Sequence, residues 1–350
     1  MKNIAIIYHD ADFDGILSNK VCRYWLKKLY PDAEIHSYGW DYGRPTPQVI
    51  AENDELCDAW VNYNKIYIVD LSVDELMARP ELRDKIVWID HHKSAIEKWD
   101  VPDLNEHLGI TKQHKFVGYR IDGVAACRLC WQWLASENGP HGDPRIHGAD
   151  VYLPTLKNFV DRAVSEPELL RLAGEYDIWD HRDPDAKALQ FGLRALDSRA
   201  FKSLVDAQLN NDGSELGRGT AFSLLRKAII SGLNIKAYTD KVNAEYANQF
   251  AYPVDFEGLT FCALNGSGRN SDAVQPAATV HDALLSWRLT PTGVAVSLYH
   301  ALGHEHQDLS VIAKKYGGGG HRGACGFRCT MEQFLQLGLH KPKSVIPKSV

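Results

Sequence analysis

The sequence lacks the features that would place it in a membrane or in an oxidising compartment. No run of about 18 apolar residues is present, so we expect no transmembrane helix and no membrane partner. Asp10 follows the first apolar run too soon for a secretory segment. The seven cysteines are odd in number and irregularly spaced, which does not indicate a disulfide framework. These absences predict a cytoplasmic protein.

The Cys127-x-x-Cys130 pair has no second cysteine pair near it. It lies in a helical pattern, so we expect buried core residues rather than a zinc site.

Positive charge is also scarce. The formal net charge is −6, and the only compact basic run is the C-terminal tail with Lys341, Lys343 and Lys348. A protein that follows long nucleic acid usually presents a basic face. We therefore expect a small anionic ligand, such as a short nucleotide, and no long duplex partner. The sequence leaves the oligomeric state open, with a homodimer among the options.

Three apolar runs, at residues 2–8, 65–69 and 85–89, each end in side chains that bind metal ions. Short continuous apolar runs are typical of buried parallel strands. Functional groups on an open parallel sheet gather outside the carboxyl ends of its strands. The side chains that we expect at this edge are His9, Asp10, Asp12, Asp14, Asp70, Asp90, His91 and His92.

The chemistry of these side chains predicts metal binding. Several carboxylates in one place repel one another, and a divalent cation removes that repulsion. A mixture of histidine and aspartate without cysteine suits Mn²⁺, Zn²⁺ or Fe²⁺ better than Ca²⁺ or Mg²⁺. So many carboxylates indicate two ions, the usual arrangement for phosphoester hydrolysis. The alternative is that these aspartates are turn residues and helix N-caps, which three strand ends together disfavour.

The motifs resemble those of the DHH phosphoesterase superfamily in order and spacing. The matching residues are His9-x-x-Asp12-x-Asp14-Gly15, Val69-Asp70-Leu71-Ser72 and Asp90-His91-His92. The superfamily has a fourth motif that supplies one more aspartate from a helix. Its best match is Asp177, with Asp161 as the second choice and Asp180 as the third.

The resemblance implies a set of roles at this centre. One Mn²⁺ ion would be held by His9, Asp12 and Asp70. The other would be held by Asp14, Asp70, His91 and Asp177, so that Asp70 bridges the two. His92 would lie near the leaving phosphate as a catalytic residue, and Asp90 would orient an imidazole. Mg²⁺, Co²⁺ and Fe²⁺ are the alternative cofactors.

A glycine-rich segment near the C-terminus, residues 313–327, resembles the signature of the DHHA1 domain. Glycines allow backbone N–H groups to approach a phosphate closely, and His321 and Arg322 add donors and charge. A plain helix C-cap is the alternative. The family often has an arginine in the strand before this loop, where this chain has Tyr299. The expected substrate-binding residues are Gly318, Gly319, Gly320, His321, Arg322, Arg269 and Arg288.

The expected fold is α/β, with a parallel-sheet DHH domain and a smaller α/β DHHA1-like domain joined by a helical linker. We place the DHH domain at residues 1–200, the linker at 201–250, the second domain at 251–340 and a flexible tail at 341–350. Helical patterns cover residues 16–29, 124–134, 152–179, 222–250 and 308–316. Further strands are expected at 34–38, 259–264, 283–289, 294–299 and 326–329.

The resemblance implies an enzyme that uses Mn²⁺ to hydrolyse phosphodiester bonds in short oligonucleotides or in linear or cyclic dinucleotides. It also admits 3′-phosphoadenosine 5′-phosphate as a substrate. Three alternatives stay open. A single-strand exonuclease would need a basic, aromatic channel, of which Trp40, Tyr42 and Arg44 are the only local hint. A polyphosphate or pyrophosphate hydrolase would share the metal site, and a non-catalytic nucleotide sensor would have lost the metal ligands.

Overall fold

The computed structural model describes residues 2–46, 59–99, 116–135, 153–180, 182–211, 213–266, 281–301 and 303–343. The chain divides into two compact units, Met1–Leu233 and Asn234–Val350. The predicted fold class is confirmed, because the first unit holds a parallel α/β sheet and the second a separate sheet with its own helices. No helix among these residues is long and apolar enough to cross a membrane.

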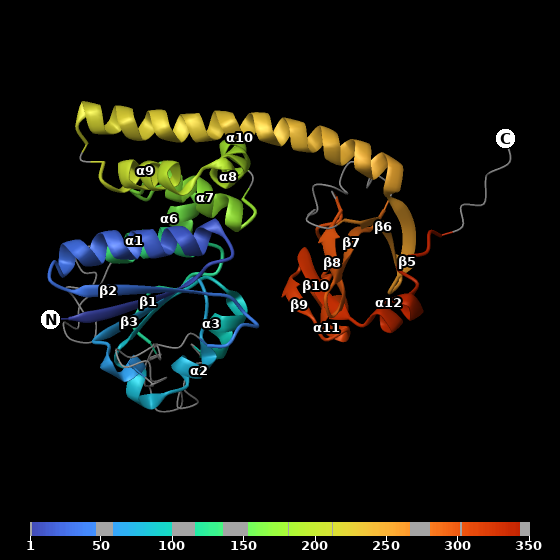
Figure 1. The fold of residues 1–350 in the computed structure, drawn as a ribbon, viewed down its shortest axis with the longest axis horizontal. Helices are drawn as coiled ribbons and strands as arrows, with labels where there is room; N and C mark the ends of the chain where they lie inside the picture. The colour runs from blue at the N-terminus through green and yellow to red at the C-terminus, as the bar shows by residue number, and fades with distance from the viewer. Residues whose placement is uncertain are drawn as a thin grey trace. The chain divides into compact units, whose positions relative to one another are not determined.

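The N-terminal unit is built on a four-stranded parallel sheet (Figure 1). The strand order is β2-β1-β3-β4, and all three pairings are parallel. The carboxyl ends of these strands therefore meet at one edge. The strands are β1 (Asn3–His9), β2 (Glu34–Trp40), β3 (Lys65–Val69) and β4 (Ile86–Ile89).

Both faces of β1, β3 and β4 are buried, which explains their continuous apolar runs. Along β1, Ile4 and Ile6 enter one core, whereas Ala5 and Ile7 enter the other. Figure 1 shows α1 on one face and α2 on the opposite face. The first core also includes α4, and the second includes α3 and two short 3₁₀ helices. These elements are α1 (Phe13–Leu29), α2 (Asp74–Met77), α3 (Lys93–Trp99), α4 (Ala126–Ala135), η1 (Ala59–Asn62) and η2 (Pro80–Leu82).

Further helices thicken the core on the α1 side. The sequence predicted one largely helical stretch at 152–179, but α6 and α7 are separated there. Arg162 has a positive φ of 55°, and Pro167 precedes α7, so the helix does not continue. The helices are α6 (Leu156–Val160), α7 (Glu168–Asp177), α8 (Pro184–Ala195), α9 (Ser198–Leu209) and α10 (Glu215–Phe250).

The expected linker at 201–250 differs from the observed division of the chain. Leu204 in α9 and Leu225 in α10 are buried in the N-terminal core, so the first part of that stretch belongs to the N-terminal unit. The 36-residue helix α10 contains the boundary between the two units. The sequence pattern showed helix there, but it could not show which apolar face packs on which core.

The C-terminal unit contains a six-stranded sheet with the order β5-β6-β7-β8-β10-β9. Only the β6–β7 pairing is parallel. Its apolar core includes Phe261, Phe327 and Phe334. The sequence did not predict β5, β9 or α12. The elements are β5 (Tyr252–Phe256), β6 (Leu259–Asn265), β7 (Ala283–Thr290), β8 (Gly293–His300), α11 (Ser310–Lys315), β9 (Gly319–His321), β10 (Ala324–Cys329) and α12 (Met331–Leu337).

Candidate metal centre

The carboxyl ends of three neighbouring strands bring histidine and aspartate side chains together. His9 is the last residue of β1, Asp70 follows β3, and Asp90 follows β4. Because β3 pairs in parallel with both β1 and β4, these three residues lie at the same edge of the sheet. The apolar runs in the sequence predicted this placement.

The start of α1 adds two carboxylates to this edge. Asp12 is the N-cap of the helix, and its side chain accepts a hydrogen bond of 3.1 Å from the Gly15 N–H. A side chain at position 15 would be impossible without movement, because a Cβ atom would lie 2.0 Å from the carbonyl oxygen of His9. The helix therefore begins in contact with the end of β1, which holds Asp12 and Asp14 beside His9.

Asp14 is fixed by a second helix. Its carboxylate is buried, and it accepts hydrogen bonds of 2.7 Å from the backbone N–H groups of both Ala126 and Cys127. These groups belong to the first turn of α4, where unpaired N–H groups and the helix dipole favour an anion. The carboxylate of Asp14 is thus held in place before any ligand binds.

Asp177 reaches the centre from the last residue of α7. Its Oδ2 atom lies 3.3 Å from Nε2 of His91. The preceding turn is rigid, because the fully buried Glu175 forms ion pairs with Arg162 at 2.8 Å and Arg171 at 3.1 Å. This network fixes the end of the helix that carries Asp177.

The other two candidates for the fourth motif have different surroundings. Asp180 forms an ion pair of 2.6 Å with Arg182. Asp161 is exposed and ends α6. Within the described parts of the chain, neither belongs to a group of side chains that could hold a metal ion.

Three groups of potential ligands form at this edge, and in each the ligand atoms lie within 4.8 Å of one another. Asp70 belongs to two of them, and one of its oxygens faces His9 while the other faces His91. Its Oδ2 lies 3.5 Å from Nδ1 of His9, and its Oδ1 lies 3.3 Å from Nε2 of His91. The groups are His9, Asp12 and Asp70; Asp14, His91 and Asp177; and Asp70, His91 and His92.

Unpaired buried atoms show that these residues fit a metal ion. Asp70 is only 1% exposed, and neither of its carboxylate oxygens has a hydrogen-bond partner within the described structure. Nδ1 of His9 is also buried without a partner. Such groups are costly unless something binds them. Asp70 further has a φ of 62°, a conformation that non-glycine residues adopt mostly under local constraint.

The charges of the centre shift its protonation in the metal-free state. Burial, and then the charge of Asp14, raise the pKa of Asp70 well above its ordinary value. The same two causes raise the pKa of Asp177. Burial favours neutral His9, but the carboxylates of Asp12 and Asp70, at 3.1 and 3.5 Å from its Nδ1, outweigh burial and raise the pKa of His9 to about 11. Without metal, the site therefore retains protons that a cation would displace.

Asp90 organises the turn after β4. The carboxylate is fully buried, and its Oδ1 accepts hydrogen bonds from the N–H groups of His91 at 2.7 Å and His92 at 3.2 Å. The same oxygen lies 2.7 Å from Nδ1 of His92. Asp90 belongs to none of the ligand groups found in the described chain. Through this contact Asp90 holds the ring of His92.

Sequence reasoning missed Asp41, which touches the first ligand. Its Oδ1 lies 3.2 Å from Nε2 of His9, so the opposite nitrogen of that ring faces Asp12 and Asp70. Asp41 directly follows β2, which pairs in parallel with β1. The same strand-end argument would have found Asp41, but the sequence pattern ended this strand at Tyr38 instead of Trp40.

The glycine-rich segment is partly explained by helix termination. The N–H of Gly317 bonds to the carbonyl of Lys314 at 3.0 Å, and the N–H of Gly318 bonds to that of Ala313 at 2.9 Å. With a φ of 77° at Gly317, this is a Schellman cap at the end of α11. Both amides are therefore engaged in the cap that the sequence analysis considered as the alternative.

Gly318 and Gly319 have different surroundings. A Cβ atom on Gly318 would lie 2.0 Å from the carbonyl oxygen of Gly326, whereas one on Gly319 would meet nothing within 4 Å. Gly318 is thus needed for packing against β10. Gly319, Gly320 and the backbone of His321 form β9, which pairs with β10.

The other expected substrate-binding residues have different surroundings. Arg322 donates a hydrogen bond of 3.0 Å to the carbonyl of His306, and its side chain is largely exposed. Arg288 is exposed on β7, and Arg269 lies outside the described residues. Tyr299, at the position where the family often has arginine, is partly buried in β8 and pairs with Ala324 of β10.

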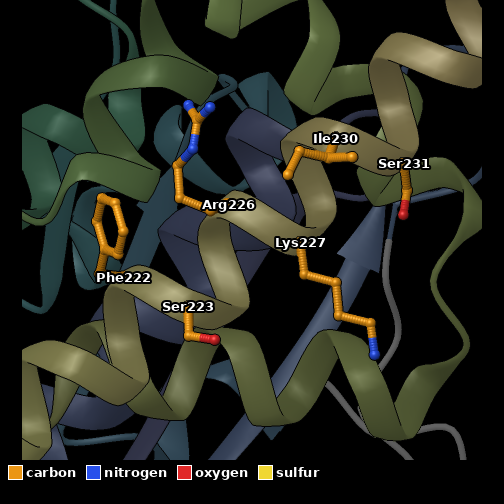
Figure 2. A pocket seen from close by; sticks show the side chains of 6 residues that line it. All are labelled: Phe222, Ser223, Arg226, Lys227, Ile230 and Ser231. Atoms are coloured by element: carbon orange, nitrogen blue, oxygen red, sulfur yellow. The ribbon is translucent and has the colours of Figure 1, made fainter.

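Two further features lie outside the metal groups. Cys127 and Cys130 are buried free thiols, so the prediction that they are core residues is confirmed. An open pocket of about 460 Å³ lies on α10 and contains no member of the ligand groups. Figure 2 shows the side chains that line it. Its lining residues are Phe222, Ser223, Arg226, Lys227, Ile230 and Ser231.

Comparisons with known proteins find likeness only among solved structures, since no protein-family model and no curated protein matches. The pGpG-specific phosphodiesterase PggH from Vibrio cholerae is 13% identical, with a TM-score of 0.39, over 97% of this chain and 96% of that one. An exopolyphosphatase-related protein from Bacteroides fragilis is 12% identical, with a TM-score of 0.47, over 96% of this chain and 90% of that one. Exonuclease RecJ bound to manganese is 14% identical, with a TM-score of 0.44, over 97% of this chain and 89% of that one. At such identities and scores, the assignment of a function rests on the site itself.

Proposed function

We propose that this protein is a metal-dependent phosphoesterase of the DHH type that hydrolyses phosphodiester bonds in short oligonucleotides or in linear or cyclic dinucleotides. A further candidate substrate is 3′-phosphoadenosine 5′-phosphate. The observation that carries the proposal is Asp70, whose two buried oxygens lack hydrogen-bond partners in the described structure and face the imidazoles of His9 and His91. A carboxylate in this position can bridge two cations.

The ligand groups suggest how two ions would be held. His9, Asp12 and Asp70 would hold one ion, and Asp14, Asp70, His91 and Asp177 would hold the other. Mn²⁺ suits the mixture of imidazole and carboxylate, with Mg²⁺, Co²⁺ and Fe²⁺ as alternatives. When bound, such a pair supplies a nucleophilic water and positive charge for a phosphate.

His92 is placed to move a proton. Its Nδ1 is held by Asp90 at 2.7 Å, so Nε2 is the nitrogen that can face a substrate. Burial favours the neutral ring, but the hydrogen bond and charge of Asp90 outweigh burial and raise the pKa of His92. A protonated Nε2 can donate to the oxygen that leaves phosphorus, which is general acid catalysis.

A short substrate suits the charges of this chain. The net charge is −6, and Arg44, a cation beside the centre, already binds the carboxylate of Asp10 at 2.8 Å. Long single strands bind along basic, aromatic-lined grooves that contact many phosphates. The sensor alternative is less favoured because a sensor would not need three complete ligand groups.

The experiment that tests the proposal compares substrates on protein treated with EDTA and then reconstituted with Mn²⁺. The panel contains the linear dinucleotide pApA, a cyclic dinucleotide, 3′-phosphoadenosine 5′-phosphate, polyphosphate and a single strand of about 24 nucleotides. We expect hydrolysis that requires Mn²⁺ and is fastest on the short nucleotides. Salt should change their kcat/KM much less than the roughly 10³- to 10⁵-fold fall between 50 and 200 mM that is typical of six to ten phosphate contacts.

Each other result has a clear meaning. Fastest hydrolysis of polyphosphate would reassign the substrate class, and fastest hydrolysis of the long strand with steep salt dependence would favour an exonuclease. Binding of nucleotides without turnover of any substrate would contradict the enzymatic proposal.

A further inference from the structure

The segment after β2 forms a tight turn beside the metal centre. The N–H of Arg44 bonds to the carbonyl of Asp41 at 3.2 Å, which closes a four-residue turn. Gly43 occupies the third position with a φ of 85°, the conformation that a type II turn requires there. Tyr42 therefore stands at the second position, on the outside of the turn.

Three contacts hold this turn in place. The indole N–H of the buried Trp40 donates to the carbonyl of Pro45 at 2.9 Å. One nitrogen of Arg44 lies 2.9 and 2.8 Å from the two carboxylate oxygens of Asp10. The ring of Tyr42 packs edge-on against that of Trp40, with 5.3 Å between their centroids. The position of Tyr42 is thus fixed by the protein before a substrate arrives.

The ring of Tyr42 lies at two of the strand-end motifs. Its centroid is 6.3 Å from that of His9, the ligand at the end of β1. Its hydroxyl oxygen accepts a hydrogen bond of 3.1 Å from the N–H of Ser72, two residues after Asp70. The phenol group therefore spans the edge where the first ligand group gathers.

The chemistry of this hydroxyl leaves one hydrogen bond to be made. The oxygen already accepts from Ser72, so the remaining capacity of the group includes donation of its own proton. The Ser72 side chain beside it acts as a further donor to the phenol oxygen, and among the described residues no hydrogen bond donated by this hydroxyl is found. The side chain is nevertheless 50% exposed, so a ligand can reach it. Burial raises the pKa of Tyr42 above its ordinary value, so the phenol keeps its proton at neutral pH.

We propose that Tyr42 donates a hydrogen bond from its hydroxyl to a non-bridging oxygen of the substrate phosphate at the metal centre. The inference rests on the proposed phosphoesterase function and adds a substrate-contacting residue that the motifs do not contain. The Ser72 N–H polarises the phenol oxygen, and hydrogen bonds in such chains strengthen one another. The aromatic residue that suggested a nucleic-acid channel in the sequence thus has a specific role toward phosphate.

The test is Tyr42→Phe, which removes the hydroxyl and keeps the ring against Trp40 and His9. Tyr38→Phe is the matched control, because Tyr38 lies on β2 just before the turn and its hydroxyl contacts that of Tyr63 at 2.6 Å. We would measure kcat and KM on the fastest substrate of the panel, Mn²⁺ affinity, the melting temperature and inhibition by inorganic phosphate.

We expect Tyr42→Phe to lose roughly 10- to 100-fold in kcat/KM, the effect of one hydrogen bond to a charged group. The inhibition constant of inorganic phosphate should rise, while Mn²⁺ affinity and the melting temperature stay close to those of Tyr38→Phe. Kinetics equal to those of Tyr38→Phe would overturn the inference and leave the proposed function standing. Activity that falls only in step with Mn²⁺ affinity would also overturn it, since Tyr42 would then support the fold of the centre. No Mn²⁺-dependent turnover by the wild type on any substrate would instead refute the proposed function itself.

Discussion

Nε2 of His91 lies 3.3 Å from Oδ1 of Asp70, although that buried oxygen makes no hydrogen bond within the described structure. The imidazole and the carboxylate are thus close together, but their geometry is not that of a hydrogen bond. In the metal-free protein, burial and the charge of Asp14 instead raise the pKa of Asp70. The carboxylate is thus arranged for a cation rather than for its protein neighbours.

Asp70→Asn should separate stability from function. Asparagine is among the residues that best tolerate the φ of 62° at this position, so the turn should survive. We expect Mn²⁺ binding to weaken and hydrolysis to fall roughly 10²-fold or more, since the bridging charge is lost. The metal-free variant should melt at a higher temperature than metal-free wild type, because the neutral amide avoids the cost that burial and the charge of Asp14 impose on the carboxyl group.

Calorimetric Mn²⁺ titration, kinetics and thermal melting of EDTA-treated samples check this prediction. Hydrolysis by the variant at the wild-type rate after Mn²⁺ reconstitution would contradict the two-ion arrangement.

Asp41 should control metal affinity through the orientation of His9. The Asp41 carboxylate lies 3.2 Å from Nε2 of His9, which fixes the ring so that Nδ1 faces the ligands. Asp41→Ala should lower Mn²⁺ affinity about 10- to 100-fold. Asp41→Asn keeps an oxygen acceptor and should lose less. Glu34→Ala, at the opposite end of β2, is the exposed control. Equal Mn²⁺ affinity for all three variants would show that Asp41 does not orient the ring.

The metal-free protein should lose stability as pH rises. Asp70 and Asp177 have raised pKa values in the folded protein. Folding therefore becomes less favourable as the pH rises above about 3.8, the pKa of these groups in the unfolded chain. The stability that His9 gains from its carboxylate partners is complete below its unfolded pKa of 6.5 and is lost as pH rises toward about 11. The lowered pKa of Asp12 acts only at acidic pH and does not oppose this trend.

Thermal melts at about pH 6.5 and pH 8.5, with EDTA or with Mn²⁺, measure this effect. The melting temperature with EDTA should fall between these values. The increase caused by Mn²⁺ should be larger at the higher pH, because fewer protons must be displaced. Each 1 kcal/mol corresponds to roughly 2–4 °C for a unit of this size. A flat or rising curve with EDTA would contradict the pKa directions.

The two neighbouring glycines allow packing and substrate binding to be tested apart. Gly318→Ala would place a Cβ atom 2.0 Å from the carbonyl oxygen of Gly326, so we expect about 1–3 kcal/mol of destabilisation. Gly319→Ala meets open space, so its melting temperature should stay near that of the wild type. If β9 contacts the substrate's phosphate, Gly319→Ala should still raise KM. An unchanged KM would reduce this segment to a helix cap and a strand.

The sequence predicted most of the candidate centre because its ligands follow from local patterns. The apolar runs before His9, Asp70 and Asp90 are buried parallel strands, and parallel strands place their carboxyl ends at one edge. Asp41 escaped because the glycine at position 39 indicated a turn, so the last two strand residues, Gly39 and Trp40, were not predicted. The placement of these ligands at one edge followed from the predicted parallel topology, and no distance was needed to predict it.

Contacts between distant segments could not be predicted. Nothing in the sequence around Asp14 indicates that the first turn of α4 supplies its two hydrogen-bond donors. The close approach of Gly318 to β10 is likewise a tertiary contact. The Schellman cap, by contrast, is a local pattern of a helix followed by glycine. The sequence analysis gave it as the alternative to phosphate binding.

The proposed ligands come from five separate segments, from β1 near the start of the chain to the end of α7 at Asp177. No two neighbouring segments could form either ion site alone, because Asp70 and His91 must meet partners that are distant in sequence. Closing such loops is slow and comes late in folding. Manganese should therefore be bound only after the N-terminal unit has folded. The rate at which tight Mn²⁺ binding appears during refolding would then report the rate at which α7 packs onto the sheet edge.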